Sequence, residues 1–208
     1  MDETNKILEA SDILFRKYGI RSVTMTDIAR QLGISKKTLY LHIENKRDLV
    51  TKMMQRYIAQ EQKMCLQIKE DAENALDELI KISLYVQIQV KDINPSLLFD
   101  LQKYHRPVWE LLDQYHKKDI AFLVESNLRR GVSEGLYRQD LFVELIAKIY
   151  VGLTPILSDL DLFPADKFPT HILHKEFVKY HISGIVSEKG KKLLTSMLEN
   201  LDPEREIH

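Results

Sequence analysis

The sequence predicts an all-α protein of about nine helices, and three observations lead to this fold class. Glycine and proline are scarce, with seven and six among 208 residues, which is about half their usual combined share. Apolar residues recur at intervals of three and four along most of the chain, the period of an amphipathic helix. No stretch of useful length alternates apolar with polar residues as a half-buried strand does.

Three short helices are expected in the first fifty residues. The apolar spacing over 4–18 predicts the first, which ends before Gly19 because glycine accepts the left-handed backbone that terminates a helix. Thr24 is expected to cap the second helix, with Asp27 completing a capping box. Ser35 is expected to cap the third helix, which extends to about His42.

Residues 24–49, with the sequence TMTDIARQLGISKKTLYLHIENKRDL, have the pattern of a helix-turn-helix. Ala29 is small where two helices cross closely, and Gly33 suits the tight turn between them. The apolar side chains of this segment are expected to share one core with the first helix: Ile13, Leu14, Ile28, Leu32, Ile34 and Leu39. The polar side of the third helix is then free, and a helix of this width fits a major groove.

Charge is concentrated in the same segment. The whole chain has a formal net charge of -1, yet residues 30–47 contain five basic residues and one acidic residue. A solvated charged face would explain this count by itself, but on a helix-turn-helix it favours a confined DNA contact. Capped helix N-termini also favour phosphate. The predicted DNA-binding residues are Thr24, Thr26, Lys36, Lys37, Thr38, Tyr40, His42 and Lys46.

This segment resembles the N-terminal domain of the TetR (tetracycline repressor-like) family. The residues that carry the resemblance are Thr24, Ile28-Ala29, Gly33, Leu39-Tyr40-Leu41-His42-Ile43, Lys46 and Asp48-Leu49. Ile43 stands where the family usually has Phe, and we interpret it as a variation in the core. Residues 131–138, GVSEGLYR, also resemble a turn that is common before the eighth helix of the family.

The resemblance implies a transcription regulator that forms a homodimer. Its two heads would bind neighbouring major-groove turns of a palindromic double-stranded DNA operator. It also implies a body with a pocket for a small-molecule effector that controls the spacing of the heads. We therefore divide the chain into a helix-turn-helix DNA-binding domain, 1–48, and a helical ligand-binding and dimerisation domain, 49–208.

The body is expected to be helical throughout. Its predicted helices cover 46–69, 72–91, 95–104, 107–130, 140–160 and 170–200, the last with an interruption near 188–190. The second of these is apolar nearly all round, which predicts a buried helix. Asp140 is a candidate cap for the fifth.

Broad apolar faces on 141–160 and 170–186 make these helices the best candidates for a four-helix bundle between two subunits, although the faces could instead pack within one subunit. The predicted interface residues are Leu145, Ile149, Leu153, Phe177, His181, Gly184 and Ile185. The candidate pocket residues are Tyr85, Phe99, Tyr104, His105, Trp109, Tyr115, Phe122 and Tyr150. This mixture suits a moderately hydrophobic ligand, but aromatic residues at helical spacing also form ordinary cores.

Other classes of protein find little support. No catalytic motif, phosphate-binding glycine loop or cofactor motif is present, and the pair His171 and His174 lacks further metal ligands. One cysteine, Cys65, excludes an intrachain disulfide and fits a reducing cytoplasm. No signal pattern begins the chain, and no apolar run reaches the ~18 residues that span a membrane.

The favoured hypothesis is a cytoplasmic repressor, not an enzyme, that a small hydrophobic ligand releases from its operator. Two alternatives remain open. One is a DNA-binding regulator that a protein partner controls, and the other is an enzyme with an appended DNA-binding head.

Overall fold

The computed structural model describes residues 3–91, 93–94 and 96–200, and within them helices form the whole architecture. The α-helices are α1 (Glu3–Tyr18), α2 (Met25–Leu32), α3 (Lys36–Tyr40), α4 (Lys46–Asp71), α5 (Ala75–Lys91), α6 (Ser96–Tyr104), α7 (Arg106–Tyr115), α8 (Ala121–Ser133), α9 (Val143–Leu153), α10 (Thr170–Ile185) and α11 (Glu188–Asn200). A π-helical turn, η1 (His116–Ile120), joins α7 to α8, and a 3₁₀ helix, η2 (Thr154–Ser158), follows α9. The described residues contain one isolated β-bridge, Tyr137 to Val186, and no longer ladder. The predicted all-α fold is confirmed.

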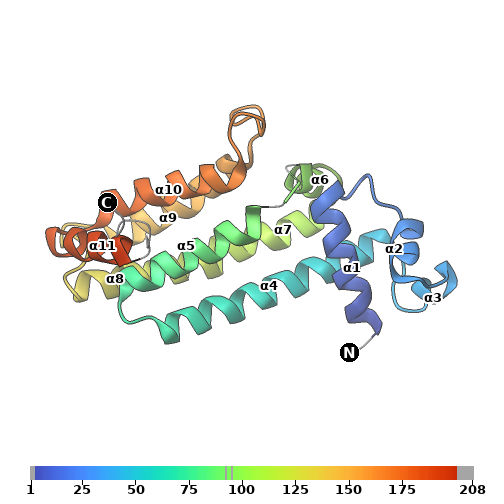
Figure 1. Cartoon of the computed structure of the whole chain (residues 1–208), viewed down its shortest axis with the longest axis horizontal. Coiled ribbons are helices and arrows are strands. Elements are labelled where there is room, and N and C mark those ends of the chain that lie inside the picture. Colours follow the sequence, from blue (N-terminus) through green and yellow to red (C-terminus); the bar gives the residue numbers. More distant parts are fainter. Residues whose placement is uncertain (1–2, 92, 95, 201–208) are drawn as a thin grey trace, which may run out of the picture.

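The elements are arranged along one long axis (Figure 1). Helices α1 to α3 form a head at one end, and α8 to α11 lie at the other end. Helix α4 starts in the head and continues along the body, so the predicted domain boundary at 48/49 falls inside its first turn. The boundary therefore stays a prediction. Among the described residues, no helix is both long and apolar enough to cross a membrane.

The head packs around a buried core that continues into α4, α6 and α7. Ile7, Phe15, Ile28 and Leu39 are each 0% exposed, and Ile43 is 1% exposed, so its interpretation as a core residue is confirmed. Leu14, Leu32 and Ile34 pack against this core as partly buried residues.

One expected member of the head core was wrong. Ile13 is 60% exposed. The buried residues of α1 are Ile7, Leu8, Ala10, Ser11 and Phe15, which lie on one side of the helix at helical spacing. Ile13 falls outside that face.

The predicted caps of the head are confirmed. The Thr24 hydroxyl accepts a hydrogen bond from the Asp27 amide, and the Asp27 carboxylate accepts one from the Thr24 amide, which completes the capping box. Gly33 has a φ of +67° and ends α2. Ser35 caps α3 through the Thr38 amide, but α3 ends at Tyr40 rather than near His42.

The body departs from prediction at three places. The second half of α5 is partly open: Leu84 and Ile88 are 46% and 71% exposed, so the helix is not buried all round. The helix expected over 107–130 is divided by the π turn, and α8 continues to Ser133. The left-handed residue that follows α8 is Gly135, with a φ of +70°, whereas Gly131 lies within α8.

Helix α9 also begins later than expected. It starts at Val143, its N-cap residue is Phe142, and no side chain forms a capping hydrogen bond there. Asp140 is therefore not the cap. The final stretch divides as expected into α10 and α11. Residue 95, which was expected to open α6, lies outside the described residues.

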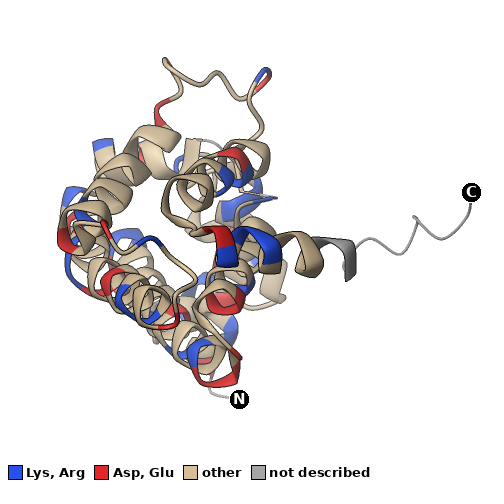
Figure 2. Cartoon of the chain, turned by 90° about the vertical axis from the view of Figure 1, so that its left-hand side faces the viewer, with Lys and Arg blue, Asp and Glu red and all other residues tan. Residues whose placement is uncertain are grey.

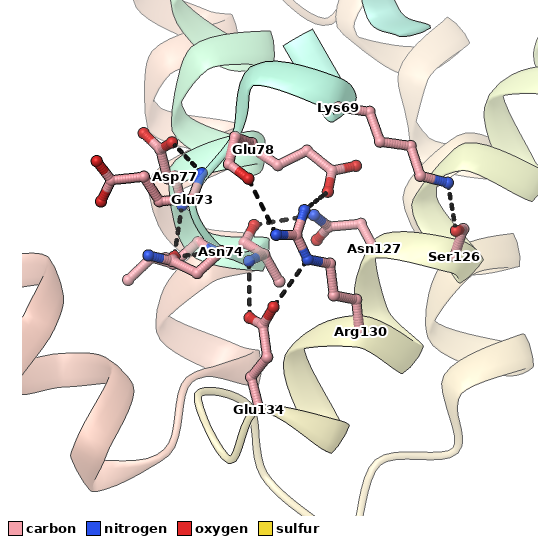
Figure 3. Close-up of polar contacts among 12 residues, drawn as sticks. Lys69, Glu73, Asn74, Asp77, Glu78, Ser126, Asn127, Arg130 and Glu134 are labelled. Atoms are coloured by element: carbon pink, nitrogen blue, oxygen red, sulfur yellow. Dashed lines mark hydrogen bonds and ion pairs between the residues drawn. The ribbon is translucent and has the colours of Figure 1, made fainter.

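A second buried core lies in the body, and a cluster of polar residues beside it joins the α4–α5 turn to α8. Tyr137 is fully buried, and its hydroxyl lies 3.0 Å from the Asn127 side-chain oxygen. Arg130 donates to the carboxylates of Glu78 and Glu134 and to the Ala72 carbonyl. Figure 3 shows these groups converging where the α4–α5 turn meets α8. The buried Glu78 carboxylate is thereby paired, as a buried charge must be to be tolerated.

Candidate nucleic-acid interface

Helix α3 exposes its polar residues because its apolar residue, Leu39, packs into the core of the head. Leu39 is fully buried, while Lys36, Lys37 and Tyr40 are exposed, Tyr40 by 46%. The Ser35 cap satisfies one first-turn amide, and the other free amides add partial positive charge at the same end. Lys36, Lys37 and Tyr40 therefore form one exposed polar surface, which we call the α3 surface.

The other predicted contacts have varied surroundings. Thr26 is exposed. The Thr24 hydroxyl is occupied by the capping box, where it also donates to Asp27 at 2.6 Å. Thr38 is half-buried, and its hydroxyl lies 2.9 Å from that of Ser35. The His42 Nδ1 lies 3.4 Å from the Thr4 hydroxyl, which places His42 between α1 and the end of α3.

Lys46 differs from its expected role. Its ammonium donates to the Val23 carbonyl and lies 5.9 Å from the centre of the Phe15 ring. Burial lowers the pKa of Lys46. Its side chain therefore turns inward and ties α4 to the turn before α2, leaving the backbone amides at the start of α4 as the nearest groups for a phosphate.

Two basic residues of the head were left out of the prediction. Arg47 is exposed at the start of α4, and the Arg30 side chain is 76% exposed on α2. Both were part of the basic count over 30–47, and that count was the signal that pointed to them. At the opposite end of the molecule, acidic and basic residues are interspersed (Figure 2).

The head is fastened to the body through α6. The Arg21 amide donates to the buried Asp100 carboxylate at 3.1 Å. The Arg21 guanidinium donates to the Tyr104 hydroxyl at 3.0 Å and lies 4.5 Å from the centre of that ring. Asn94, just before α6, donates its amide to the Arg16 carbonyl at 2.6 Å. These contacts join α6 and the segment before it to α1 and to the turn between α1 and α2.

The predicted pocket residues are spread along the body from α5 to α9. Tyr85 lines a cavity between α1, α4 and α5. Phe99, Tyr104 and Phe122 are exposed, by 45%, 44% and 67%.

The remaining four predicted pocket residues also lie apart from that cavity. Tyr115 and Trp109 pack against the head-side core, and His105 precedes α7. Tyr150 lies against Phe177 and His181, with ring centres 4.9 and 4.6 Å apart.

The predicted interface residues are mostly accessible. Leu145, Ile149 and Leu153 are exposed, by 48%, 47% and 36%. Gly184 is exposed, with no heavy atom within 4 Å of an added Cβ. Phe177 and His181 are half-buried against Tyr150.

Ile185 is a correction to this set. It is 2% exposed and belongs to the body core, so it is not available to a partner. The prediction also left out several exposed apolar side chains of the same region: Phe142, Ile156, Leu160, Ile172 and Tyr180.

Comparison with known proteins identifies the head. Residues 7–53 match the family model for bacterial regulatory proteins of the tetR family. Over 189 residues the chain is 27% identical to the uncharacterized HTH-type transcriptional regulator YvaF of Bacillus subtilis (strain 168), covering 88% of this chain and 96% of that protein. The head therefore belongs to the tetR family, and the chain is a transcriptional regulator of TetR type.

Further TetR-family relatives match along most of the chain. The HTH-type transcriptional repressor KstR2 of Mycolicibacterium smegmatis is 21% identical over 197 residues, which cover 90% of this chain and 93% of that protein. The structure of the ketosteroid transcriptional regulator KstR2 of Mycobacterium tuberculosis superposes with a TM-score of 0.61 at 20% identity, covering 90% and 96% of the two chains. E. coli NemR in its reduced form gives a TM-score of 0.72 at 13% identity, with 90% and 98% covered. These likenesses show that the TetR fold extends through the body.

Proposed function

We propose that the protein is a homodimeric repressor that binds a palindromic operator through the α3 surface. The observation that carries this proposal is the position of Lys36, Lys37 and Tyr40 outside a fully buried Leu39. The core fixes the rotation of α3, so the same side chains always face outward. Thr26 and the N-termini of α2 and α4 would hold flanking phosphates.

Dimerisation is supported by an apolar surface on α9, η2 and α10, which we call the α9–α10 face. It includes Leu145, Ile149, Leu153, Ile156 and Ile172, each 36–48% exposed. Several large apolar side chains exposed on neighbouring elements are typical of a surface that a partner covers. Two-fold symmetry would double the number of phosphate contacts that one head can make.

Release by a small ligand is supported by the contacts that join the body to the head. Helix α6 contacts the α1–α2 turn through Asp100 and Tyr104. Suppose that α6 has one arrangement that allows DNA binding and another that does not. A ligand that binds the second arrangement more tightly would lower operator affinity, by an amount set by the difference between its affinities for the two arrangements. Control by a protein partner is the competing proposal, and it would act on the same contact.

The proposal is tested with the full-length protein and double-stranded DNA from upstream of its own gene, followed by fluorescence anisotropy at several salt concentrations. We expect a dimer by sedimentation, and binding that weakens steeply with salt because Lys and Arg displace counterions from phosphate. A folded dimer that does not bind this DNA at low salt, or binds it no better than unrelated DNA, would contradict the proposal.

A further inference from the structure

A large cavity opens between the head and the body. It has a volume of about 1020 Å³ and is lined by residues of α1, α4 and α5. This is the size of a small-molecule site. Because α1 belongs to the head and α5 to the body, a molecule bound here contacts both parts of the chain. None of the predicted pocket residues except Tyr85 lines it.

The inner wall of this cavity holds a buried carboxylate, Glu61, that forms no close ion pair. Glu61 is 6% exposed, and its Oε1 accepts a hydrogen bond from the Tyr85 hydroxyl at 2.6 Å. Within the part of the chain that the structure describes, no Lys, Arg or His nitrogen lies within 4.0 Å of this carboxylate. A buried charge without a partner is costly, and burial accordingly raises the pKa of Glu61.

Basic residues around the cavity are committed elsewhere or lie at its edge. Arg16 donates through Nε to both oxygens of Asp12, at 2.9 and 2.8 Å, and through Nη1 to the Gln89 carbonyl. Lys17 and Lys63 line the cavity but are solvent-exposed. Arg16 still acts on Glu61 at a distance and lowers its pKa, against the larger opposite effect of burial. The deep part of the cavity therefore holds two carboxylates, Asp12 and Glu61, and one guanidinium, while the two lysines are exposed at the rim.

The rest of the cavity suits an apolar group beside a cation. Tyr57 and Tyr85 also line the cavity, and the faces of aromatic rings attract cations. The Arg16 guanidinium lies 5.9 Å from the centre of the Tyr57 ring, so the Tyr85 ring is the one offered to a ligand. Ile13, Met64 and Ile88 complete the wall and are 60%, 41% and 71% exposed. A ligand in the cavity would cover these three apolar side chains.

We propose that this cavity binds an organic cation with an apolar body, whose ammonium group pairs with Glu61 while its apolar part covers Ile13, Met64 and Ile88. The ligand supplies the charge that Glu61 lacks and buries the three apolar side chains. It also bridges α1 to α4 and α5. That binding changes DNA affinity is a second step, and this step alone rests on the proposed function.

Three probes that differ only in their end group test the proposal: 4-phenylbutylammonium, 4-phenylbutanol and 4-phenylbutanoate. Their binding to the full-length protein, without DNA, is measured by isothermal titration calorimetry. We expect the ammonium probe to bind at least about tenfold more tightly than the carboxylate probe, with the alcohol between them. Equal binding of the three, tighter binding of the carboxylate, or no binding of any probe would overturn the proposal.

The variant Glu61→Gln keeps the shape of the side chain and removes its charge. It should lose most of the preference for the ammonium probe while binding the alcohol as before, and Glu70→Gln, at an exposed position of α4, should behave as the wild type. An unchanged preference in Glu61→Gln would show that the charge selectivity arises elsewhere. If Glu61→Gln does not fold, the ranking of the three probes on the wild type still decides the question.

The two proposals fail separately. DNA binding measured without a probe tests the proposed function, and probe binding measured without DNA tests the cation site. A protein that binds its operator but discriminates against the ammonium probe retains the proposed function and loses this inference.

Discussion

The buried carboxylate of Asp100 on α6 accepts a hydrogen bond from the backbone amide of Arg21 at 3.1 Å. Arg21 lies in the turn between α1 and α2, so this bond joins the DNA-reading head to the body. Gly19 lies beside it with a φ of +78°, and an added Cβ there would lie 2.7 Å from the Ser96 hydroxyl of α6. The head and α6 are thus closely fitted as well as hydrogen-bonded.

Removing this acceptor should destabilise the protein. Asp100→Ala leaves the Arg21 amide without its partner, and a hydrogen bond to a charged group contributes about 1.5–3 kcal/mol. The free energy of unfolding from urea titration measures the effect. Asp140→Ala is the control, because its side chain is 75% exposed and its ion pair with Arg138 is long, at 3.7 Å, so it should cost close to nothing. Equal stability of the two variants would contradict this account of Asp100.

Gly131 should tolerate no side chain. A Cβ there would lie 2.1 Å from Cδ2 of the fully buried Tyr137 ring, and relieving such an overlap in a packed core costs about 1–3 kcal/mol or more. Gly131→Ala should therefore unfold at a clearly lower temperature. Gly152→Ala is the matched control in α9, because no heavy atom lies within 4 Å of its added Cβ, and alanine favours a helix over glycine by about 1 kcal/mol. A stable Gly131→Ala variant would show that Tyr137 can move aside.

Acid should destabilise the body partly through His181. Burial against Tyr150 and its neighbours lowers the pKa of His181 to about 4, whereas an unfolded histidine titrates near about 6.5. Between these values the unfolded chain binds more protons, so stability is full above about pH 6.5 and falls towards pH 4, by at most about 3 kcal/mol from this group.

The comparison that isolates His181 is the variant His181→Gln. His105, His116 and His174 also have lowered pKa values, so they give the same trend in both proteins. Unfolding free energies measured from pH 7 to pH 4.5 should fall less steeply in the variant. Parallel curves would exclude His181 as a source of the pH dependence.

The head was predictable because its signals are local. Thr24, Ser35 and Gly33 act on residues within four positions of themselves, and the structure places each as a cap or turn. Ile13 was misplaced because helical spacing alone did not show which of two neighbouring apolar faces meets the other helices. In the body, the π turn and the left-handed Gly135 depend on how α7, α8 and Tyr137 pack together, which no local pattern records.

The same difference between local and long-range signals applies to the site residues. The exposed positions of Lys36 and Lys37 were predicted from helical periodicity, whereas the inward turn of Lys46 depends on the Val23 carbonyl, 23 positions away. Glu61 was not singled out because a glutamate on a helix is ordinarily solvated. Only the packing of α5 against α4 buries it.

The α9–α10 face should hold the dimer together. Ile149→Glu places a charge on this face, and burying it without a partner should raise the dimer dissociation constant by about 100-fold or more. Sedimentation equilibrium measures the change. Ile13→Glu is the control, since Ile13 is also exposed but lies on α1. A dimer that survives Ile149→Glu unchanged would show that the subunits associate through another surface.

The most direct test of the α3 surface is the operator affinity of Lys37→Ala, measured by fluorescence anisotropy across a salt series. We expect weaker binding and a salt dependence of log K that is shallower by about one, because one phosphate contact is lost. Lys117→Ala, at an exposed position in the body, should match the wild type in both respects. Unchanged affinity and slope in Lys37→Ala, in a protein that binds its operator, would contradict the account of how this head contacts DNA.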